Sequence, residues 1–277
     1  MEKFEFKQRV ENLVSIFVSD PQNPYTLSEL IRLAAANGAG LSQIVAAQGM
    51  AQEKISYEVL LHKVMESFRH NLGVCELGLT RGRSFLLGTV ASDLAQANRE
   101  GRALIEDDLL NRAMTYTLAT EVGNHEVGLN PCAGTGDSCP YTGLIRALQE
   151  HPYPEEEVAL ATALILKIGS IFRVGKQTTG CNMEGLGAGA AATAAVLTEL
   201  RGGTPVQTGR AIVLALSPTI AVPCTPRVMV PGLCATHITG AILLGNQGAN
   251  LALKTSLPVP VDVDVMIAMA ARIPATA

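Results

Sequence analysis

Apolar positions recur at helical spacing along most of this chain, and residues that start or end helices lie between them. Thr26-Leu27-Ser28-Glu29 has the capping-box pattern, in which the threonine hydroxyl and the glutamate carboxylate accept bonds from backbone N–H groups at a helix start. The helix that begins there is expected to end at Gly38, because glycine adopts the left-handed conformation that closes many helices. A second helix is predicted from Ser56 by an apolar stripe, which consists of Leu60, Val64, Phe68 and Leu72.

The same reasoning extends over the rest of the chain. Thr204 is suited to cap a helix, and Pro205 is suited to its first position, where no N–H is needed. Only residues 258–265 alternate as a strand would. No repeat or linker divides the sequence, so the prediction is one all-α domain over 1–277, with peripheral helices in 1–55. The further predicted helices cover 84–99, 106–122, 155–172, 184–200 and 236–253.

Composition narrows the class of protein. With 48% hydrophobic residues and a net charge of −4, the chain has enough apolar surface to fold. It has no basic run, so nucleic acid is not expected as a partner. The charge-free run 228–253 has the length of a membrane span, but it contains Pro231, His237 and Asn246. A buried helix beside a functional loop is therefore favoured over a membrane helix.

The six cysteines are too few for a disulfide scaffold in a chain of 277 residues. The opening segment MEKFEFKQRV is charged and lacks the apolar core of a signal peptide. These features predict a cytoplasmic protein with reduced thiols, which are then available for metal binding or catalysis.

Cys181, Cys224 and Cys234 lie at loop-like positions in the Gly/Pro-rich half of the chain. Their spacing matches no short ligand motif, so three buried cysteines remain one interpretation. Zinc is a second, with His237 as the fourth ligand. An iron–sulfur cluster is a third, and three thiolates on a four-iron cluster would leave one iron open as a Lewis acid.

The region around these cysteines resembles the α subunit, or α domain, of bacterial iron–sulfur-dependent L-serine dehydratases. Order is preserved from about residue 40 to 250, with weaker matches at His70-Asn71-Leu72 and in the Gly-rich turn 133–138. The main matching pieces are Gly180-Cys181-Asn182-Met183-Glu184, Gly202-Gly203-Thr204-Pro205, Cys224-Thr225-Pro226 and Cys234.

The resemblance implies an all-helical catalytic domain whose Gly/Pro-rich loops hold a [4Fe-4S] cluster on Cys181, Cys224 and Cys234. The active-site core would lie in 120–255. The implied reaction is β-elimination, meaning dehydration and deamination, of L-serine or a related β-substituted small acid, with the open iron as Lewis acid. The alternatives are an L-cysteine desulfidase-like lyase and a non-catalytic, metal-binding subunit.

The sequence also departs from the family's pattern. The second cysteine is followed by Thr225-Pro226-Arg227 in place of the family's Asp-Pro-Val, and the Ser-His-Thr-x-Gly-Pro segment of the family's β part does not occur. Either a separate β chain completes the enzyme, or the substrate is another β-substituted amino or hydroxy acid. A homo- or hetero-oligomer is expected.

Substrate-binding candidates centre on the Gly-rich turn before a helix predicted at Tyr141. Backbone N–H groups at such a turn form an anion site, and an ordinary tight turn is the alternative. Cys132 and Cys139 flank this turn, and they are interpreted as further ligands, as a redox pair or as buried residues. Cys75 is expected in the core. The candidates for substrate binding are Gly134, Thr135, Gly136, Arg227, His70 and Asn71.

Acid–base candidates are chosen by residue type and setting. Glu184 is an acid in a long apolar stretch, where burial would raise its pKa and suit it to act as a base. A helix N-terminal acid that complements the dipole is the alternative. Asp137, Ser138 and His125 complete the catalytic set, with a structural, hydrogen-bonded histidine as the alternative for His125.

Overall fold

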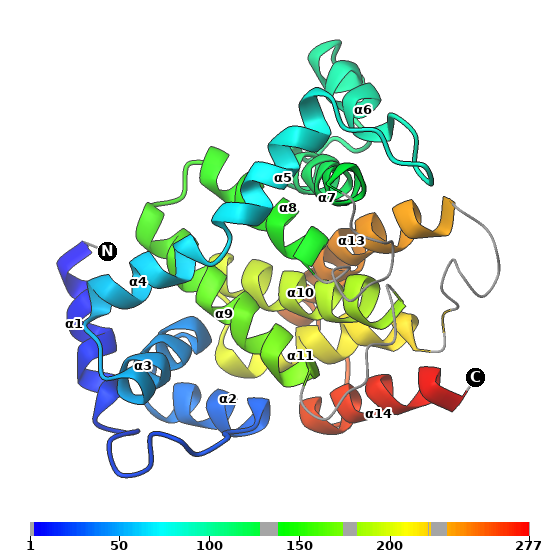
Figure 1. Ribbon diagram of the computed structural model, residues 1–277. Coiled ribbons are helices and arrows are strands. Elements are labelled where there is room, and N and C mark those ends of the chain that lie inside the picture. The colour runs from blue at the N-terminus through cyan, green and yellow to red at the C-terminus, as the bar shows by residue number, and fades with distance from the viewer. Residues whose placement is uncertain (1–2, 128–137, 174–181, 221, 223–231, 277) are drawn as a thin grey trace.

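The computed structural model describes residues 3–127, 138–173, 182–220, 222 and 232–276 (Figure 1). These residues form helices, with one isolated β-bridge between Ser84 and Gly88 and no strand. The helices in chain order are α1 (Lys3–Val14), α2 (Leu27–Ala36), α3 (Leu41–Glu53), α4 (Tyr57–Glu66), α5 (Arg69–Thr80), α6 (Val90–Arg99), α7 (Asp108–Glu126), α8 (Ser138–Glu150), α9 (Glu155–Arg173), the π-helix η1 (Asn182–Ala188), α10 (Gly189–Leu200), α11 (Pro205–Leu216), the 3₁₀ turn η2 (Ser217–Thr219), α13 (Gly232–Lys254) and α14 (Val263–Thr276).

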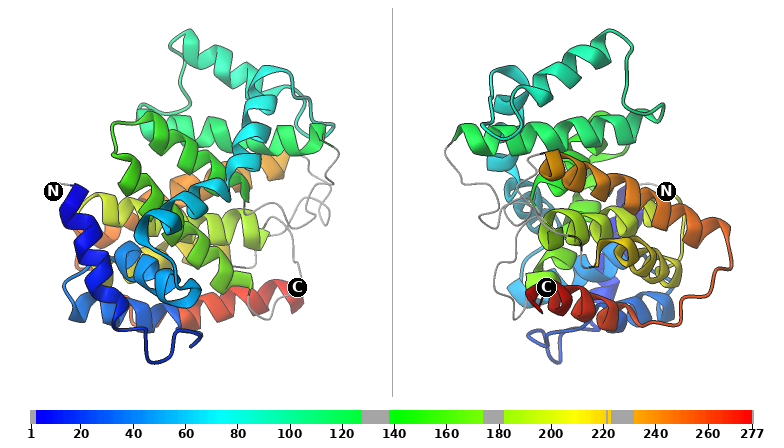
Figure 2. Two further views of the ribbon diagram at one scale, coloured as in Figure 1. Left: turned by 60° about the vertical axis from the view of Figure 1, so that its left-hand side comes forward. Right: turned by 90° about the vertical axis from the view of Figure 1, so that its right-hand side faces the viewer.

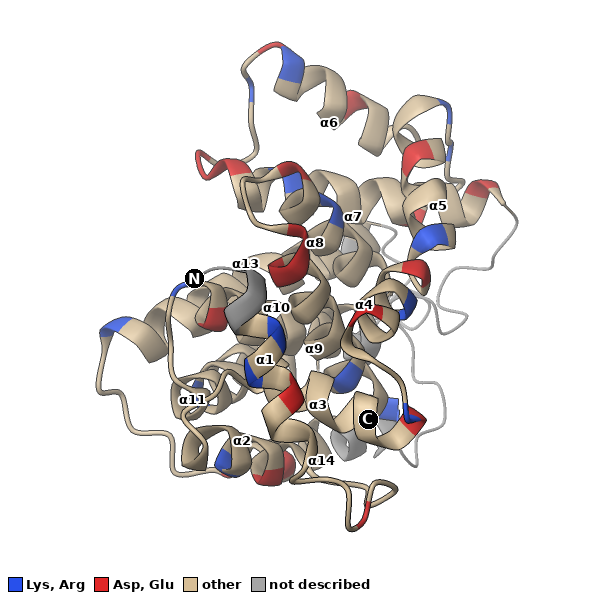
Figure 3. Cartoon of the chain, turned by 90° about the vertical axis from the view of Figure 1, so that its left-hand side faces the viewer, with Lys and Arg blue, Asp and Glu red and all other residues tan. Residues whose placement is uncertain are grey.

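The centre of the molecule is α10, which packs against α9, α11 and α13 (Figures 1 and 2). Its sequence GAAATAAVLTEL is buried from Gly189 to Thr198, because small side chains let the neighbouring backbones approach closely. Helices α5 to α8 form a second group, with α6 at the outer edge in every view. Charged side chains gather on outer helices such as α4, α5 and α6, whereas α10 carries only Glu199 (Figure 3).

Helix starts follow the local signals in the sequence. The Thr26–Glu29 capping box is formed, with Thr26 N–H donating to Glu29 Oε2 at 2.8 Å. Gly38 follows the end of α2 with φ +58°, as expected for a closing glycine. Thr204 caps α11 in the same way, and its N–H donates to Gln207 Oε1 at 2.9 Å.

Three predictions about elements need correction. The stripe from Ser56 is divided between α4 and α5. Residues 84–89 precede α6 as a tight turn, in which Ser84 and Gly88 exchange backbone bonds of 2.9 and 2.8 Å. The helix expected over 184–200 begins as the π-helix η1.

The alternating pattern at 258–265, noted as the one strand-like stretch of the sequence, does not form a strand. The segment 255–262 has no regular structure, and α14 begins at Val263. Pro258 and Pro260 lack the N–H that a ladder requires. Asp262 instead starts the helix, because its Oδ1 accepts a bond of 2.8 Å from Asp264 N–H.

Helices α5 and α7 touch through their backbones. A Cβ on Gly78 would lie 1.8 Å from Ala119 O, and a Cβ on Gly123 would lie 2.0 Å from Val74 O. Only glycine fits at either position, so the contact fixes α7 closely against α5.

None of the described helices is by itself both long and apolar enough to cross a membrane. The pair α2 and α3 reaches that length and composition together, with a bend of 107° between the two helices.

Candidate functional site

Two thiols from separate helices meet at one carboxylate in the interior. Glu121 on α7 accepts a bond of 2.9 Å from Cys139 Sγ, on α8, at its Oε2 atom. Its Oε1 atom accepts from Cys234 Sγ, on α13, at 3.4 Å. Glu121 is 2% exposed and both cysteines are fully buried. The carboxylate therefore holds both sulfur atoms at one place inside the protein.

The same face of α7 supplies two more polar groups, because residues three and four positions apart lie above one another on a helix. Asn124 Nδ2 donates to Cys139 Sγ at 3.5 Å. His125 Nε2 lies 3.2 Å from Glu121 Oε1, and its side chain is 2% exposed. Glu121, Asn124, His125, Cys139 and Cys234 are called the thiol–carboxylate cluster below.

Ser84 determines which ring nitrogen of His125 accepts a hydrogen bond. Its Oγ accepts bonds from Leu86 N–H at 3.1 Å and Leu87 N–H at 2.9 Å, and its remaining contact is His125 Nδ1. With both lone pairs of the hydroxyl occupied, Ser84 donates its proton to Nδ1, so Nε2 is the ring nitrogen that can donate toward the cluster.

The Nε2 proton of His125 points toward the cluster without a well-aligned acceptor. The contact with Glu121 Oε1 is close, but within the described chain Nε2 has no hydrogen bond of good geometry. The ring of Phe85, with its centroid 5.5 Å from that of His125, covers the imidazole. His125 is therefore a buried donor aimed at a site that another group can occupy.

Glu121 carries a buried negative charge. Burial pushes the pKa of its carboxyl upward, but the nearby His125 ring and the thiol bonds from Cys139 and Cys234 outweigh this and hold the pKa below its usual value. Its one ion-pair contact among the residues described is with His125, and no Lys or Arg there reaches it. A buried anion whose described partners are two weak thiol donors and a histidine is a favourable environment for a cation.

Cys234, predicted to be a metal ligand, lies in this cluster. His237, proposed from the sequence as a fourth zinc ligand, follows three residues later on α13 and is 7% exposed. Burial lowers the pKa of its imidazole, because the charged form loses solvation. Cys181, Cys224 and Arg227 lie outside the described residues.

Ser138, the last residue of the predicted anion-binding turn, begins α8 immediately before Cys139. The described end of that turn therefore adjoins the thiol–carboxylate cluster. Glu184 lies in η1, and nothing is described of its side chain. Gly134, Thr135, Gly136 and Asp137, as well as Cys132, lie outside the described residues.

The remaining candidates lie on α5. His70 is exposed in the first turn and Asn71 beside it is half-buried; neither is among the contacts of Glu121 or His125. Cys75 is fully buried, as predicted, and contacts Tyr116 O at 3.5 Å. Burial raises the pKa of its thiol to about 11, so Cys75 behaves as a core residue.

The described residues alone do not complete a metal site. In 3–127, 138–173, 182–220, 222 and 232–276, no three His, Cys, Asp or Glu side chains have the arrangement of a full ligand set. The donor chemistry nevertheless fits an iron–sulfur cluster, because buried thiols in a water-poor setting are its usual ligands. Cys181 and Cys224 would have to supply the rest.

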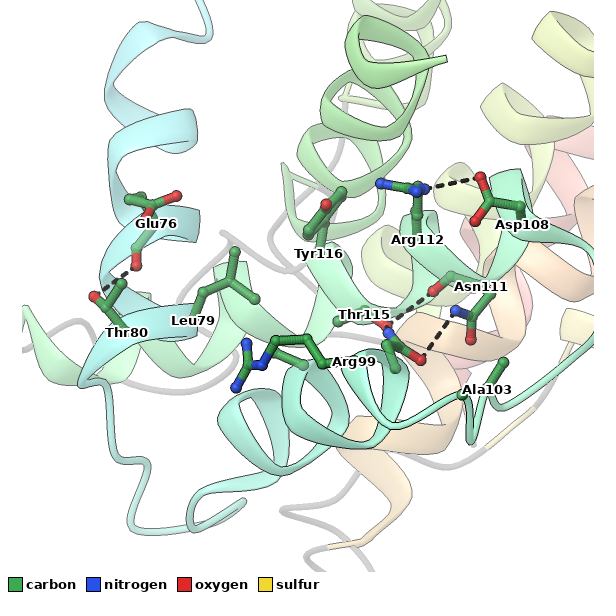
Figure 4. Close-up of a pocket in the computed structure, with 13 residues that line it drawn as sticks. Glu76, Leu79, Thr80, Arg99, Ala103, Asp108, Asn111, Arg112, Thr115 and Tyr116 are labelled. Atoms are coloured by element: carbon green, nitrogen blue, oxygen red, sulfur yellow. Dashed lines mark hydrogen bonds and ion pairs between the residues drawn. The ribbon is translucent and has the colours of Figure 1, made fainter.

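A cavity of about 540 Å³ lies elsewhere, between α5, α6 and the first half of α7 (Figure 4). Its polar side chains bond one another: Asn111 Nδ2 donates to Asn98 Oδ1, and Asn98 Nδ2 donates to Thr115 Oγ1, both at 3.1 Å. Arg112 pairs with Asp108 at 2.8 Å. These groups already have partners, which makes the cavity a weaker candidate than the thiol–carboxylate cluster.

Sequence reasoning missed Glu121, Asn124 and Ser84. A signal for the first two was present, because an acid, an amide and a histidine at positions i, i+3 and i+4 share one face of a helix. Ser84 gave no such signal, since its contact with His125 depends on a turn predicted as helix.

The fold and site define a helical protein with a buried thiol–carboxylate cluster. No protein-family model matches the chain. The chain is similar to a probable L-serine dehydratase, alpha chain, of Bacillus subtilis (strain 168), with 25% identity over 245 residues. The match covers 83% of this chain and 78% of that protein. This supports the family resemblance seen in the sequence.

Replacing Ser84 by Ala is expected to lower the free energy of unfolding by about 1–3 kcal/mol, because two backbone N–H groups and His125 Nδ1 lose their partner. Urea unfolding followed by circular dichroism measures this. Ser92→Ala is the control: its hydroxyl bonds only Thr89 O, at 2.9 Å on α6, and its loss should change stability by less than about 0.5 kcal/mol. Equal stability of the two variants would contradict the Ser84 network.

Proposed function

We propose that this chain is an iron–sulfur-dependent lyase that eliminates water and ammonia from L-serine or a related β-substituted small amino acid. The observation that carries the proposal is the meeting of Cys234, Cys139 and Glu121 in the interior, beside a histidine whose donor faces them. The similarity to a probable L-serine dehydratase alpha chain supports the choice of reaction.

In this proposal Cys181, Cys224 and Cys234 hold a [4Fe-4S] cluster. When bound, the cluster supplies a Lewis acid that makes the substrate's hydroxyl a better leaving group. Glu121 orients the Cys234 thiol from the side, and outer contacts of this kind tune metal affinity. A reduced, cytoplasmic setting would keep the thiols available for the cluster.

The chain's own groups supply binding and proton transfer. The turn 134–138 and Arg227 hold the substrate carboxylate, since backbone N–H groups and a guanidinium both favour that anion. A carboxylate, Asp137 or Glu184, removes the α-proton. His125 Nε2–H donates a hydrogen bond to the departing hydroxyl, which leaves as water with the proton that the carboxylate removed from Cα. The remaining enamine tautomerises and is hydrolysed to a keto acid and ammonia.

A second chain is part of the proposal. The relative is named an alpha chain, and the sequence lacks the segment typical of the family's β part. The active site of this chain would then be completed by a β chain that packs on it.

The test is anaerobic purification, reconstitution with ferrous iron and sulfide, and assay with L-serine and L-cysteine. We expect a brown protein that contains iron and sulfide, releases ammonia and keto acid from serine, and loses activity in air. Release of sulfide from cysteine, with serine unchanged, would favour the desulfidase-like alternative. A colourless protein that turns over neither substrate, with or without a β chain, would contradict the proposal.

A further inference from the structure

We propose that Cys139 is an additional thiolate ligand of the metal centre in this chain. This rests on the proposed function and deepens it, because the family resemblance assigns only Cys181, Cys224 and Cys234. Cys139 lies instead in the second position of α8, just after the predicted substrate turn.

The first argument is position. Cys139 Sγ and Cys234 Sγ contact the two oxygens of one carboxylate, at 2.9 and 3.4 Å. A centre bound by Cys234 therefore forms within reach of Cys139. Thiolates on one small cluster have this kind of mutual proximity, whereas a cysteine that serves only packing does not need a polar partner.

The second argument is the surroundings of the two sulfur atoms. Glu121 brings a buried negative charge, and no Lys or Arg in the described part of the chain pairs with it. His125 Nε2, buried and without an aligned hydrogen bond there, points into the same place. In an apolar core, a buried carboxylate and an imidazole donor without an aligned acceptor would be unfavourable. A bound cation with sulfur ligands accounts for all of them.

Cys75 shows the contrast. It is as fully buried as Cys139, but it lies among Ala91, Ala119 and Val122, and its Sγ contacts the backbone carbonyl of Tyr116 at 3.5 Å. Its hydrogen bonds among the described residues include none to a carboxylate. Burial of a cysteine in this fold therefore does not by itself bring a carboxylate within bonding distance.

Binding would exchange one bond for another. The Sγ–H bond of Cys139 breaks, its proton leaves to solvent, and the sulfur lone pair forms a bond to the metal. No electron transfer is needed, so the step requires only the metal ion.

The test uses Cys139→Ser and the matched control Cys75→Ser in the full chain. Serine keeps nearly the same volume at position 139 and still donates to Glu121, so a purely structural role would be preserved. Apoprotein is titrated anaerobically with Co²⁺, whose near-ultraviolet absorption reports bonds to thiolate. We expect Cys139→Ser to bind Co²⁺ at least about tenfold more weakly, with reduced thiolate absorption. Cys75→Ser should match the wild type.

Iron and sulfide counting after reconstitution is the second measurement. We expect Cys139→Ser to hold less iron per chain than Cys75→Ser. Cobalt binding and iron content equal to those of the control would overturn the assignment of Cys139. If the wild type takes up cobalt on thiolates but no sulfide, the iron–sulfur function fails, and the cobalt titration still decides the role of Cys139.

Discussion

Glu121→Gln is expected to lower elimination activity and metal affinity by about 10- to 100-fold, the usual range for a residue that orients metal ligands. Glutamine has the shape of glutamate but only one acceptor oxygen. Its NH₂ group would face a donor, either a thiol or His125 Nε2–H. At least one of the two thiols would therefore lose its hydrogen-bond acceptor. The measurements are kcat/KM for L-serine and iron per chain after anaerobic reconstitution.

Glu199→Gln is the matched control for this experiment. Glu199 is a part-buried carboxylate away from the cluster, and it accepts from Ser42 N–H at 3.1 Å and from the Ser42 hydroxyl at the start of α3. Its replacement should affect stability and leave iron content unchanged. If Glu121→Gln retains wild-type iron and turnover, Glu121 has no role at the centre.

The second large effect concerns the contact of α5 with α7. Gly78→Ala is expected to lower the free energy of unfolding by at least about 3 kcal/mol, since the new methyl group would collide with backbone atoms that cannot rotate away. The obstacle is Ala119 O, 1.8 Å from the added Cβ. Urea unfolding gives the change directly.

Gly73→Ala, on the same helix, is the control. A Cβ there meets nothing within 4 Å, so the substitution should be neutral or stabilise the protein by about 0.5–1 kcal/mol through helix propensity. Similar stabilities of the two variants would show that α5 and α7 do not pack as described. A shift of α7 would also move Glu121 and His125, so activity should fall with Gly78→Ala.

The sequence predicted helices well where local chemistry decides them. The Thr26–Glu29 box and the Thr204-Pro205 start satisfy backbone groups at a helix end, and the three glutamates in the first turn of α9 complement the helix dipole. These local effects do not depend on tertiary contacts. It failed at 84–89, where the Ser84 hydroxyl turns the backbone by accepting two N–H bonds. Periodicity cannot reveal such a turn.

The candidate site was predicted less completely. Cys234 was chosen from its setting and the family resemblance and His125 from its residue type, and both lie in the thiol–carboxylate cluster. Glu121 was passed over, because its importance comes from Cys139 and Cys234 on two other helices. Which side chains meet in the interior depends on how α7, α8 and α13 pack, and one sequence without its fold does not contain that distance information.

The order in which the cluster's residues leave the ribosome follows from their places in the chain. Glu121 and Cys139 are separated by only 18 positions on the adjacent helices α7 and α8, so they can meet while synthesis continues. Cys234 follows Glu121 by 113 positions, so its thiol reaches the carboxylate only after α8, α9, α10 and α11 have been made. The Glu121–Cys139 contact can therefore form before the contact that joins α13 to it. In the proposed function, iron loading in the cell waits until α13 has been synthesised.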